Sequence, residues 1–237
     1  MNPLIILEHI SAAYDGKPVL HDVCLTVGER DFLGVIGPNG GGKTTLLKLL
    51  MGLKSPVSGA VRYYRNGQSV SSIRMGYLPQ YSGIDRKFPI SVREVVESGL
   101  IGEVGAFGRY TPVQHEQVVH TIQRVGLEGL EHYSLSQLSG GQLQRTLLGR
   151  ALVSSPDVIV LDEPSTFLDH RSESELYTLL EEVNKQCAII LVGHDIATVV
   201  RHSHSIACVN GHFHYLSSTE SVTPEWIGTH FGSLIDL

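Results

Sequence analysis

The sequence predicts an α/β fold in which a parallel-sheet core carries an antiparallel β subdomain at its N-terminus and an α-helical subdomain as an insertion. A glycine-rich loop separates an apolar strand-like run from a helix-like run within residues 31–53. Residues 85–155 show apolar positions at helical spacing and almost no strand pattern. Beyond them apolar runs alternate with helical patterns, which is the order of elements that builds a parallel sheet.

The N-terminal part of the chain alternates short strands with turns. Asp15-Gly16 is a turn signal between the first two strands. A helix is expected from Thr44 to Leu53, because leucines recur there at helical spacing and Gly52 stands near the end. Strand patterns cover residues 4–10, 19–27, 31–36, 59–64 and 73–78.

The middle of the chain predicts helices, and the C-terminal part returns to alternation. The whole chain of 237 residues is expected to form one domain, with a core at 1–84 and 156–237 and a helical insertion at about 85–155. The expected helices are Ser91–Leu100, Gln114–Val125, Gln142–Leu152, Glu173–Lys185 and Ile196–His202, and the expected strands are Val158–Leu161 and Ala188–Val192.

Composition excludes several classes of protein. The formal net charge of -6 argues against a general nucleic-acid binder, so no nucleic-acid partner is expected. The three cysteines lie among apolar residues, which predicts buried, reduced thiols and a cytoplasmic protein. The N-terminus lacks the basic region of a signal peptide, and no apolar run approaches the ~20 residues that cross a bilayer. Any membrane-spanning part is therefore expected in another chain.

The run Gly37-Pro-Asn-Gly-Gly-Gly-Lys-Thr44 is the pattern of a phosphate-binding loop. Glycines let backbone N–H groups turn toward phosphate oxygens, and the following helix presents its positive end to the same anion. Lys43 would bind the β- and γ-phosphates, and the Thr44 hydroxyl would bind Mg²⁺. A chance glycine-rich turn is the alternative, which the flanking strand and helix disfavour. The expected nucleotide-binding residues here are Gly37, Pro38, Asn39, Gly40, Gly41, Gly42, Lys43, Thr44 and Thr45.

Asp162 and Glu163 end the apolar run that begins at Val158. Acids at the carboxyl end of a buried strand lie at the sheet edge where such folds bind ligands. Asp162 is therefore expected to hold Mg²⁺, and Glu163 to act as the general base that activates the attacking water. The alternative is a solvated acidic pair before a turn.

The run Leu138-Ser-Gly-Gly-Gln142 opens a predicted helix. Ser139 and Gln142 have the spacing of a capping box, which explains both residues without a ligand. Gly140 and Gly141 are not needed for capping, and they would let a phosphate approach the helix end. Because this helix belongs to the insertion, remote in the fold from its own phosphate loop, it is expected to complete the site of a second copy. The prediction is a head-to-tail dimer with ATP at the interface.

Four single residues complete the candidate site. His194 follows a core strand and could contact the γ-phosphate, and Gln80 is placed to sense Mg²⁺. Asp169 would lie near the dimer interface, and Tyr14 could stack on adenine. The alternatives are a structural histidine, a polar turn residue at Gln80 and an ordinary structural tyrosine. Glu163, His194 and Lys43 are the residues expected to act in catalysis.

In this order, these motifs resemble those of the nucleotide-binding subunits of ABC transporters over essentially the whole chain. The resemblance implies a P-loop ATPase core. It matches Gly37–Thr45 to Walker A, Leu138–Gln142 to the signature, Gln80 to the Q-loop and Asp162-Glu163 to Walker B with its catalytic base. Tyr14, Asp169 and His194 then correspond to the adenine-stacking loop, the D-loop and the switch histidine.

A narrower resemblance is to the ATPases of manganese, zinc and iron importers. The segments that carry it are Phe88–Val96, Leu138–Arg145 and Cys208–Tyr215. Two features depart from the pattern: Pro-Ser-Thr-Phe-Leu-Asp follows Glu163, and Gly41 stands where Ala or Ser is usual. His212 and His214 would share one face of a strand, where a zinc site is sterically conceivable. Solvated edge-strand histidines are the alternative.

The resemblance implies an ATP-hydrolysing subunit that energises a metal-ion importer from the cytoplasmic face of the inner membrane. Its expected cofactors are ATP and Mg²⁺, with Mg²⁺ held by Thr44, Gln80 and Asp162. Its expected partners are a second copy, transmembrane permease subunits that dock near Gln80 and residues 85–100, and indirectly a solute-binding protein. The alternatives are the ATPase of an iron-chelate or other transporter, and a soluble ABC ATPase that acts on DNA or ribosomes. The single motif set and the absence of heptads disfavour the last.

Overall fold

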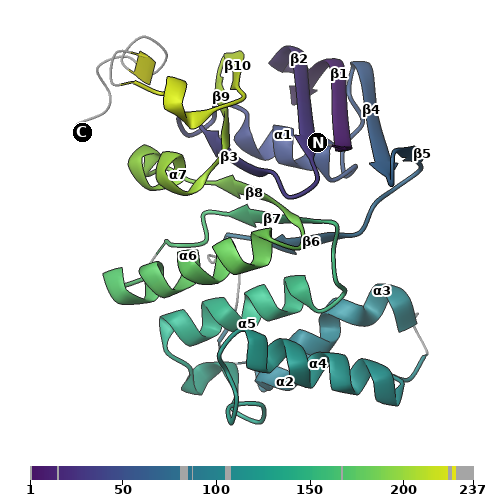
Figure 1. The fold of residues 1–237 in the computed structure, drawn as a ribbon, viewed down its shortest axis with the longest axis vertical. Coiled ribbons are helices and arrows are strands. Elements are labelled where there is room, and N and C mark those ends of the chain that lie inside the picture. Colours follow the sequence, from purple (N-terminus) through teal and green to yellow (C-terminus); the bar gives the residue numbers. More distant parts are fainter. Residues whose placement is uncertain are drawn as a thin grey trace. The chain divides into compact units, whose positions relative to one another are not determined.

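The computed structural model describes residues 2–14, 16–80, 85–86, 88–104, 108–166, 168–223 and 226–227 (Figure 1). The chain forms two compact units. The terminal unit comprises Met1–Ile73 and Asn184–Leu237, and the middle unit comprises Arg74–Val183. None of the described helices combines the length and the apolar character that crossing a bilayer requires. The predicted turn at Asp15-Gly16 falls partly outside the described residues, because Asp15 is not among them.

An antiparallel sheet in the order β2-β1-β4-β5 makes up one part of the terminal unit. The long strands β1 and β2 alternate buried and exposed side chains, so one face of the sheet is solvated. The expected strands at 4–10, 19–27 and 59–64 are confirmed, and the first two are longer than their patterns suggested. The strands are β1 (Pro3–Tyr14), β2 (Lys17–Gly28), β4 (Ser58–Arg65) and β5 (Gln68–Val70).

The other part of the terminal unit contains β3, which is buried along its whole length. β3 pairs in parallel with β8 and with β9, and β9 pairs antiparallel with β10. Neighbouring parallel strands bring their carboxyl ends to one edge, where the loops after β3 and β8 meet. The elements are β3 (Phe32–Ile36), α1 (Lys43–Leu50), β8 (Ala188–Val192), α7 (Ile196–His202), β9 (Ser205–Asn210), β10 (His212–Leu216) and the short 3₁₀ helix η4 (Thr219–Ser221).

The middle unit contains most of the helices and two parallel strands. β6 pairs with β7, with Leu78 opposite Leu161. The helix α5 packs on β6 so closely that a Cβ at Gly76 would lie 2.1 Å from the Ala151 carbonyl oxygen. The elements are β6 (Met75–Leu78), α2 (Val92–Glu97), η2 (Ser98–Leu100), α3 (Ile101–Val104), α4 (Pro112–Arg124), η3 (Leu135–Gln137), α5 (Gly140–Leu152), β7 (Val158–Asp162) and α6 (His170–Asn184).

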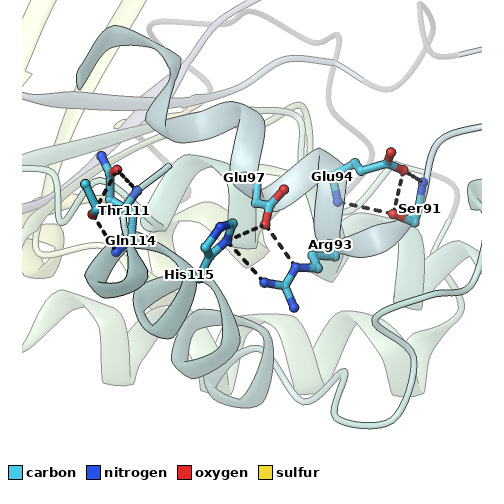
Figure 2. Close-up of polar contacts among 7 residues, drawn as sticks. All are labelled: Ser91, Arg93, Glu94, Glu97, Thr111, Gln114 and His115. Atoms are coloured by element: carbon cyan, nitrogen blue, oxygen red, sulfur yellow. Dashed lines mark hydrogen bonds and ion pairs between the residues drawn. The ribbon is translucent and has the colours of Figure 1, made fainter. Parts of the chain in front are cut away.

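Helices α2, α4 and α5 pack side by side around an apolar interior (Figure 1). Capping boxes fix where α2 and α4 begin: Ser91 with Glu94, and Thr111 with Gln114 (Figure 2). The side chains that these three helices bury completely include Val92, Val96, Val118, Ile122, Leu143 and Leu148.

One polar cluster joins α2 to α4. Figure 2 shows the Glu97 carboxylate between Arg93 and His115. Glu97 Oε1 lies 2.9 Å from Arg93 Nε and 3.2 Å from His115 Nδ1, and the Glu97 side chain is only 14% exposed. A largely buried carboxylate in contact with two basic side chains is a stronger link than a surface ion pair.

We expect Glu97→Ala to lower the free energy of unfolding by about 1–2 kcal/mol, because Arg93 and His115 lose their shared acceptor in a partly buried place. Urea denaturation followed by circular dichroism measures this. Glu175→Ala is the matched control, since Glu175 also lies between two basic side chains, Arg171 at 3.0 Å and Arg145 at 3.5 Å, but is 42% exposed. An equal loss in both variants would show that the partly buried cluster adds nothing beyond a surface pair.

Two points bear on the expected organisation. A single domain with a helical insertion at about 85–155 stays a prediction. The two compact units of the structure instead meet in the sequence between residues 73 and 74 and between residues 183 and 184. The expectation of three buried thiols is wrong for Cys24, which is exposed, whereas Cys187 and Cys208 are buried. Val23 and Leu25 beside it are buried, so alternation along β2 turns Cys24 to the solvated face.

Candidate nucleotide site

The predicted phosphate loop lies between the buried strand β3 and the helix α1, as a P-loop requires. Gly42 occupies the N-cap position of α1 with φ of 111°, and no side chain caps the helix. The N–H groups of the first helical turn therefore face the loop without a side-chain acceptor, which suits an anion such as a phosphate.

Lys43 is buried at the base of this loop, with only 8% of its surface exposed. Its ammonium donates to the carbonyl oxygens of Gly37, at 2.7 Å, and Pro38, at 3.0 Å. The two carbonyl oxygens therefore hold the positively charged Lys43 ammonium within the phosphate loop. Phosphate oxygens are stronger acceptors for the same ammonium, so the residues present fit a bound nucleotide.

The loop backbone rests against strand β9. A Cβ at Gly37, where φ is 156°, would lie 2.1 Å from the Val209 carbonyl oxygen, and a Cβ at Gly41 would lie 2.6 Å from the same atom. Both glycines are therefore required by contact with the protein's own backbone, and not only by the approach of a ligand. This contact also accounts for Gly41 where a small side chain is usual in the resembling family.

The histidine predicted to contact phosphate lies at the same sheet edge. Val35 of β3 is paired with Val192 of β8, and the Gly193 N–H donates to the Val35 carbonyl at 3.4 Å. Two parallel strands thus end together, one leading into the phosphate loop and the other into His194, which is exposed.

Asp195, the next residue, caps the helix α7. Burial works to raise the pKa of Asp195, but hydrogen bonds from Thr198 and the backbone outweigh that effect, so the pKa is lowered.

Tyr14 is the last residue of β1 and is 57% exposed. Lys54 Nζ lies 6.0 Å from its ring centroid, at the outer limit of a cation–π contact. An aromatic face this open can accept a stacked base.

In the middle unit, two predicted residues far apart in the sequence meet. Leu78 of β6 is opposite Leu161 of β7, so the residues after both strands emerge at one edge. There the Gln80 Nε2 donates to Glu163 Oε2 at 2.8 Å. This contact uses the amide nitrogen of Gln80 and not its amide oxygen, the atom that a Mg²⁺ ion would bind.

Glu163 has a left-handed backbone, with φ of 50°, which non-glycine residues rarely adopt. Thr166, which sequence reasoning missed, lies with its hydroxyl 3.4 Å from Glu163 Oε2. Tyr77, also missed, forms a side-chain hydrogen bond with Asp162. Burial first, and then the charge of Asp162, raise the pKa of Tyr77, so its phenol stays protonated and donates to that carboxylate. Two features of the sequence could have indicated these contacts: Thr166 follows Glu163 by three residues, and Tyr77 lies in the strand next to the one that ends at Asp162.

The signature segment begins α5 through a complete capping box. The Gln142 N–H donates to Ser139 Oγ at 3.2 Å, and the Ser139 N–H donates to Gln142 Oε1 at 2.9 Å. Ser139 and Gln142 therefore cap this helix, as their spacing predicts. Gly141 is constrained separately, because a Cβ there would lie 2.8 Å from Ser172 Oγ.

The contact at Gly141 brings the start of α6 beside the start of α5. The Ser172 N–H donates to Asp169 Oδ1 at 2.8 Å, and backbone and side-chain hydrogen bonds from Ser172 lower the pKa of Asp169. Arg145 and Glu175 lie 3.5 Å apart farther along the same two helices. Gly141 and Asp169, which the resemblance matches to the signature and the D-loop, therefore lie near each other in the middle unit.

The predicted site residues are divided between the two units. In the terminal unit the phosphate loop and His194 follow the paired strands β3 and β8, whereas Tyr14 ends β1 in the antiparallel sheet. The terminal unit holds Tyr14, Gly37–Thr45 and His194, and the middle unit holds Gln80, Ser139, Gly140, Gly141, Gln142, Asp162, Glu163 and Asp169.

We expect Gln80→Ala to lower the rate of ATP turnover about fivefold to tenfold while leaving ATP affinity within about twofold, because the side chain contacts Glu163 and the phosphates are expected to be held mainly by the loop around Lys43. Steady-state kinetics separates kcat from KM. Gln80→Glu, which keeps the length but repels Glu163, should be slower still. A change confined to KM would show that Gln80 serves binding alone.

Comparisons with known proteins identify the family. A family model described as ABC transporter matches residues 20–166. The chain is 36% identical over 227 residues to a protein of Chlamydia pneumoniae named as a metal transport system ATP-binding protein, covering 94% of this chain and 92% of the other. It is 34% identical to the zinc import ATP-binding protein ZnuC of Pasteurella multocida, covering 97% of this chain and 81% of the other.

Solved structures agree. One, described as an inward-facing conformation of a transporter assigned to the metal-chelate type of ABC transporter, aligns with a TM-score of 0.87 at 25% identity over 97% of this chain and 89% of that chain. A dimeric ATP-binding cassette bound to ADP and phosphate in a post-hydrolysis state aligns with a TM-score of 0.73 at 24% identity, over 90% of this chain and 98% of that chain, which supports the fold. The resemblance seen in the motifs is confirmed: this chain belongs to the ABC transporter family, as one of its ATP-binding, ATP-hydrolysing proteins.

Proposed function

We propose that this chain energises a divalent-metal importer, with zinc or manganese as the cargo and iron as a third candidate. The observation that carries the proposal is the likeness to metal transport and zinc import proteins, at 34–37% identity over 89–98% of this chain. A likeness that runs through nearly the whole chain includes the helices that would meet a permease, and not only the nucleotide motifs.

In the proposed cycle two copies bind two ATP molecules head to tail. Lys43 and the loop from Gly37 hold the β- and γ-phosphates of one ATP, and Tyr14 stacks on its adenine. The start of α5, with Ser139 and the two glycines after it, receives the γ-phosphate held by the other copy. Asp169 lies at the contact between the copies.

For hydrolysis, Glu163 takes a proton from a water molecule as that water attacks the γ-phosphorus. The bond between the γ-phosphorus and the bridging oxygen breaks, leaving ADP and phosphate. His194 contacts the γ-phosphate and orients it. Thr44, Gln80 and Asp162 offer the oxygen ligands that suit Mg²⁺, and that ion, when bound, neutralises phosphate charge.

Permease subunits would dock on the helical part of the middle unit near residues 85–100, which includes Lys87 outside the described residues. Phe88 is 61% exposed and Ile101 is 58% exposed. Gln80, which precedes this region in the sequence, donates a hydrogen bond to Glu163. Attachment to a permease would place the chain at the cytoplasmic face of the inner membrane, with a solute-binding protein as an indirect partner.

A second candidate cargo is a metal chelate such as an iron chelate. The solved structure with a TM-score of 0.87 is described as the metal-chelate type, and this observation favours it. The two cargoes differ in chemistry, because a free ion is bound by a few protein ligands whereas a chelate presents an organic surface.

Cellular metal content under metal limitation tests the proposal. The native host lacking this gene would be complemented with the wild type, with Glu163→Gln or with the exposed-site control Glu128→Gln, and its metals measured by mass spectrometry. A selective fall in zinc or manganese with Glu163→Gln alone is expected. A fall in iron that requires a chelator in the medium would favour the chelate. Unchanged metals in all strains would overturn the metal-importer assignment.

A further inference from the structure

We propose that His9, Asp22 and Cys24 form a binding site for a borderline or soft divalent cation such as Zn²⁺ on the antiparallel sheet of the terminal unit. Each of these residues offers one ligand atom, and the three atoms lie within 4.8 Å of one another. No other group of three His, Cys, Asp or Glu side chains in the described part of the chain meets this distance. His9 Nδ1 lies 2.7 Å from Asp22 Oδ1 and 3.7 Å from Cys24 Sγ. All three side chains are exposed, so a metal ion can reach them.

Two β-bulges bring these residues together. Leu7 pairs with Leu25 and Ile10 pairs with Val23, so both Glu8 and His9 stand opposite Cys24 alone. The extra residue on β1 shifts the alternation and turns His9 to the solvated face, where Cys24 already lies.

The second bulge lies on the opposite strand. Ile10 pairs with Val23 and Ala12 pairs with Leu20, so His21 and Asp22 stand opposite Ser11 alone. The Asp22 N–H donates to Ser11 Oγ at 3.2 Å, which fixes the bulged backbone. His9 and Asp22 both have left-handed backbones, with φ of 50° and 49°. Paired bulges on facing strands aim the imidazole and the carboxylate at each other, a placement that a regular ladder would not produce.

The donor set suits zinc. A tetrahedral Zn²⁺ site has N and O ligands about 2.0–2.1 Å away and S ligands about 2.3 Å away, so ligand atoms lie roughly 3.3–3.6 Å from one another. The Nδ1–Sγ distance of 3.7 Å is already close to that value. The Nδ1–Oδ1 distance of 2.7 Å is that of a hydrogen bond, which requires the proton on Nδ1 because the carboxylate only accepts. Replacing this proton by a metal ion needs an opening of about half an ångström between two exposed side chains.

Three protein ligands leave one position open, as in zinc sites that keep a water or an exogenous ligand. The neighbouring Glu8 is held by Arg62 at 2.8 Å and is not the fourth ligand. His9 and Cys24 also line a recess of about 310 Å³ that extends to Tyr215, which gives a fourth ligand room to enter. The other thiols do not compete: Cys187 and Cys208 are buried, and burial raises the pKa of Cys208 to about 12.

Calorimetry with Zn²⁺ alone, on the purified full chain kept reduced, tests the site. The variants Cys24→Ser, Asp22→Asn and His9→Asn are nearly the same size or keep a residue that tolerates a left-handed backbone, so the fold should persist. We expect one Zn²⁺ per chain in the wild type and at least tenfold weaker binding in each variant. The double variant His212→Ala/His214→Ala is the control, and it should bind as the wild type does. ATP binding by every variant checks that the protein is folded.

Co²⁺ supplies a second readout, because a thiolate bound to Co²⁺ gives a near-ultraviolet charge-transfer band. The band should be present in the wild type and in the His212→Ala/His214→Ala control, and absent from Cys24→Ser. Zinc binding that survives in Cys24→Ser and is lost in the C-terminal histidine control would overturn the proposal and assign the metal to the C-terminal histidines. A wild type that binds no Zn²⁺ would overturn it as well.

Discussion

Replacing Glu163 by glutamine is expected to lower the rate of ATP hydrolysis by about 10²–10⁴-fold, the usual contribution of a general base. The amide cannot accept the proton of the attacking water. Its oxygen can still accept from Gln80, whose present distance to the carboxylate is 2.8 Å, so the local structure should hold. A coupled assay of phosphate release measures the effect.

The same variant should trap the ATP-bound dimer, because ATP binds but is not consumed. Size-exclusion chromatography with light scattering, in ATP and Mg²⁺, should show a dimer for Glu163→Gln and a monomer–dimer mixture for the wild type. Glu128→Gln, an exposed carboxyl of the middle unit, should turn over ATP at the wild-type rate. A slow variant that stays monomeric would count against hydrolysis between two copies.

Replacing Lys43 by alanine is expected to weaken ATP binding by about 10–100-fold, because the phosphates lose a charge-assisted hydrogen bond in a place with little solvent. The ammonium also holds the carbonyls of Gly37 and Pro38, so the loop loses an internal link at the same time. Titration with a fluorescent ATP analogue measures affinity, and a thermal melt without nucleotide reports the second effect.

Lys48→Ala is the matched control, since Lys48 lies on the same helix but is exposed near its end. It should bind ATP as tightly as the wild type. Lys43→Arg keeps the charge but carries a larger, planar group and should recover only part of the affinity. Equal affinity in Lys43→Ala and the wild type would exclude the phosphate role of this residue.

Long periodic segments were predictable from the sequence, and so was the phosphate loop. The helix α5 and the strand β8 lie within a few residues of their expected bounds, because burial of one helical face or of a whole strand leaves a clear apolar pattern. The three-residue strand β5 was missed, because so short an edge strand carries no pattern of its own.

The contacts between distant segments were not predictable. The strand ends were expected near Gln80 and Glu163, but their meeting depends on β6 lying next to β7 in one register, which periodicity does not specify. The bulges at His9 and Asp22 were hidden, because a strand with one extra residue still reads as a strand. Cys24 is exposed because buried and exposed residues alternate along β2. Its apolar neighbours in the sequence made it look like part of a buried run.

The β9–β10 hairpin connects two places in the terminal unit. The carbonyl of Val209 in β9 supports the phosphate loop at Gly37 and Gly41, and Tyr215 of β10 forms one wall of the recess beside His9 and Cys24. Ala207 and Tyr215 are paired across the hairpin, and β9 is buried almost throughout. Protein interiors are close-packed and have low compressibility, so the two strands of the hairpin hold each other in place. One short hairpin therefore supports the phosphate loop with its first strand and forms a wall of the recess with its second.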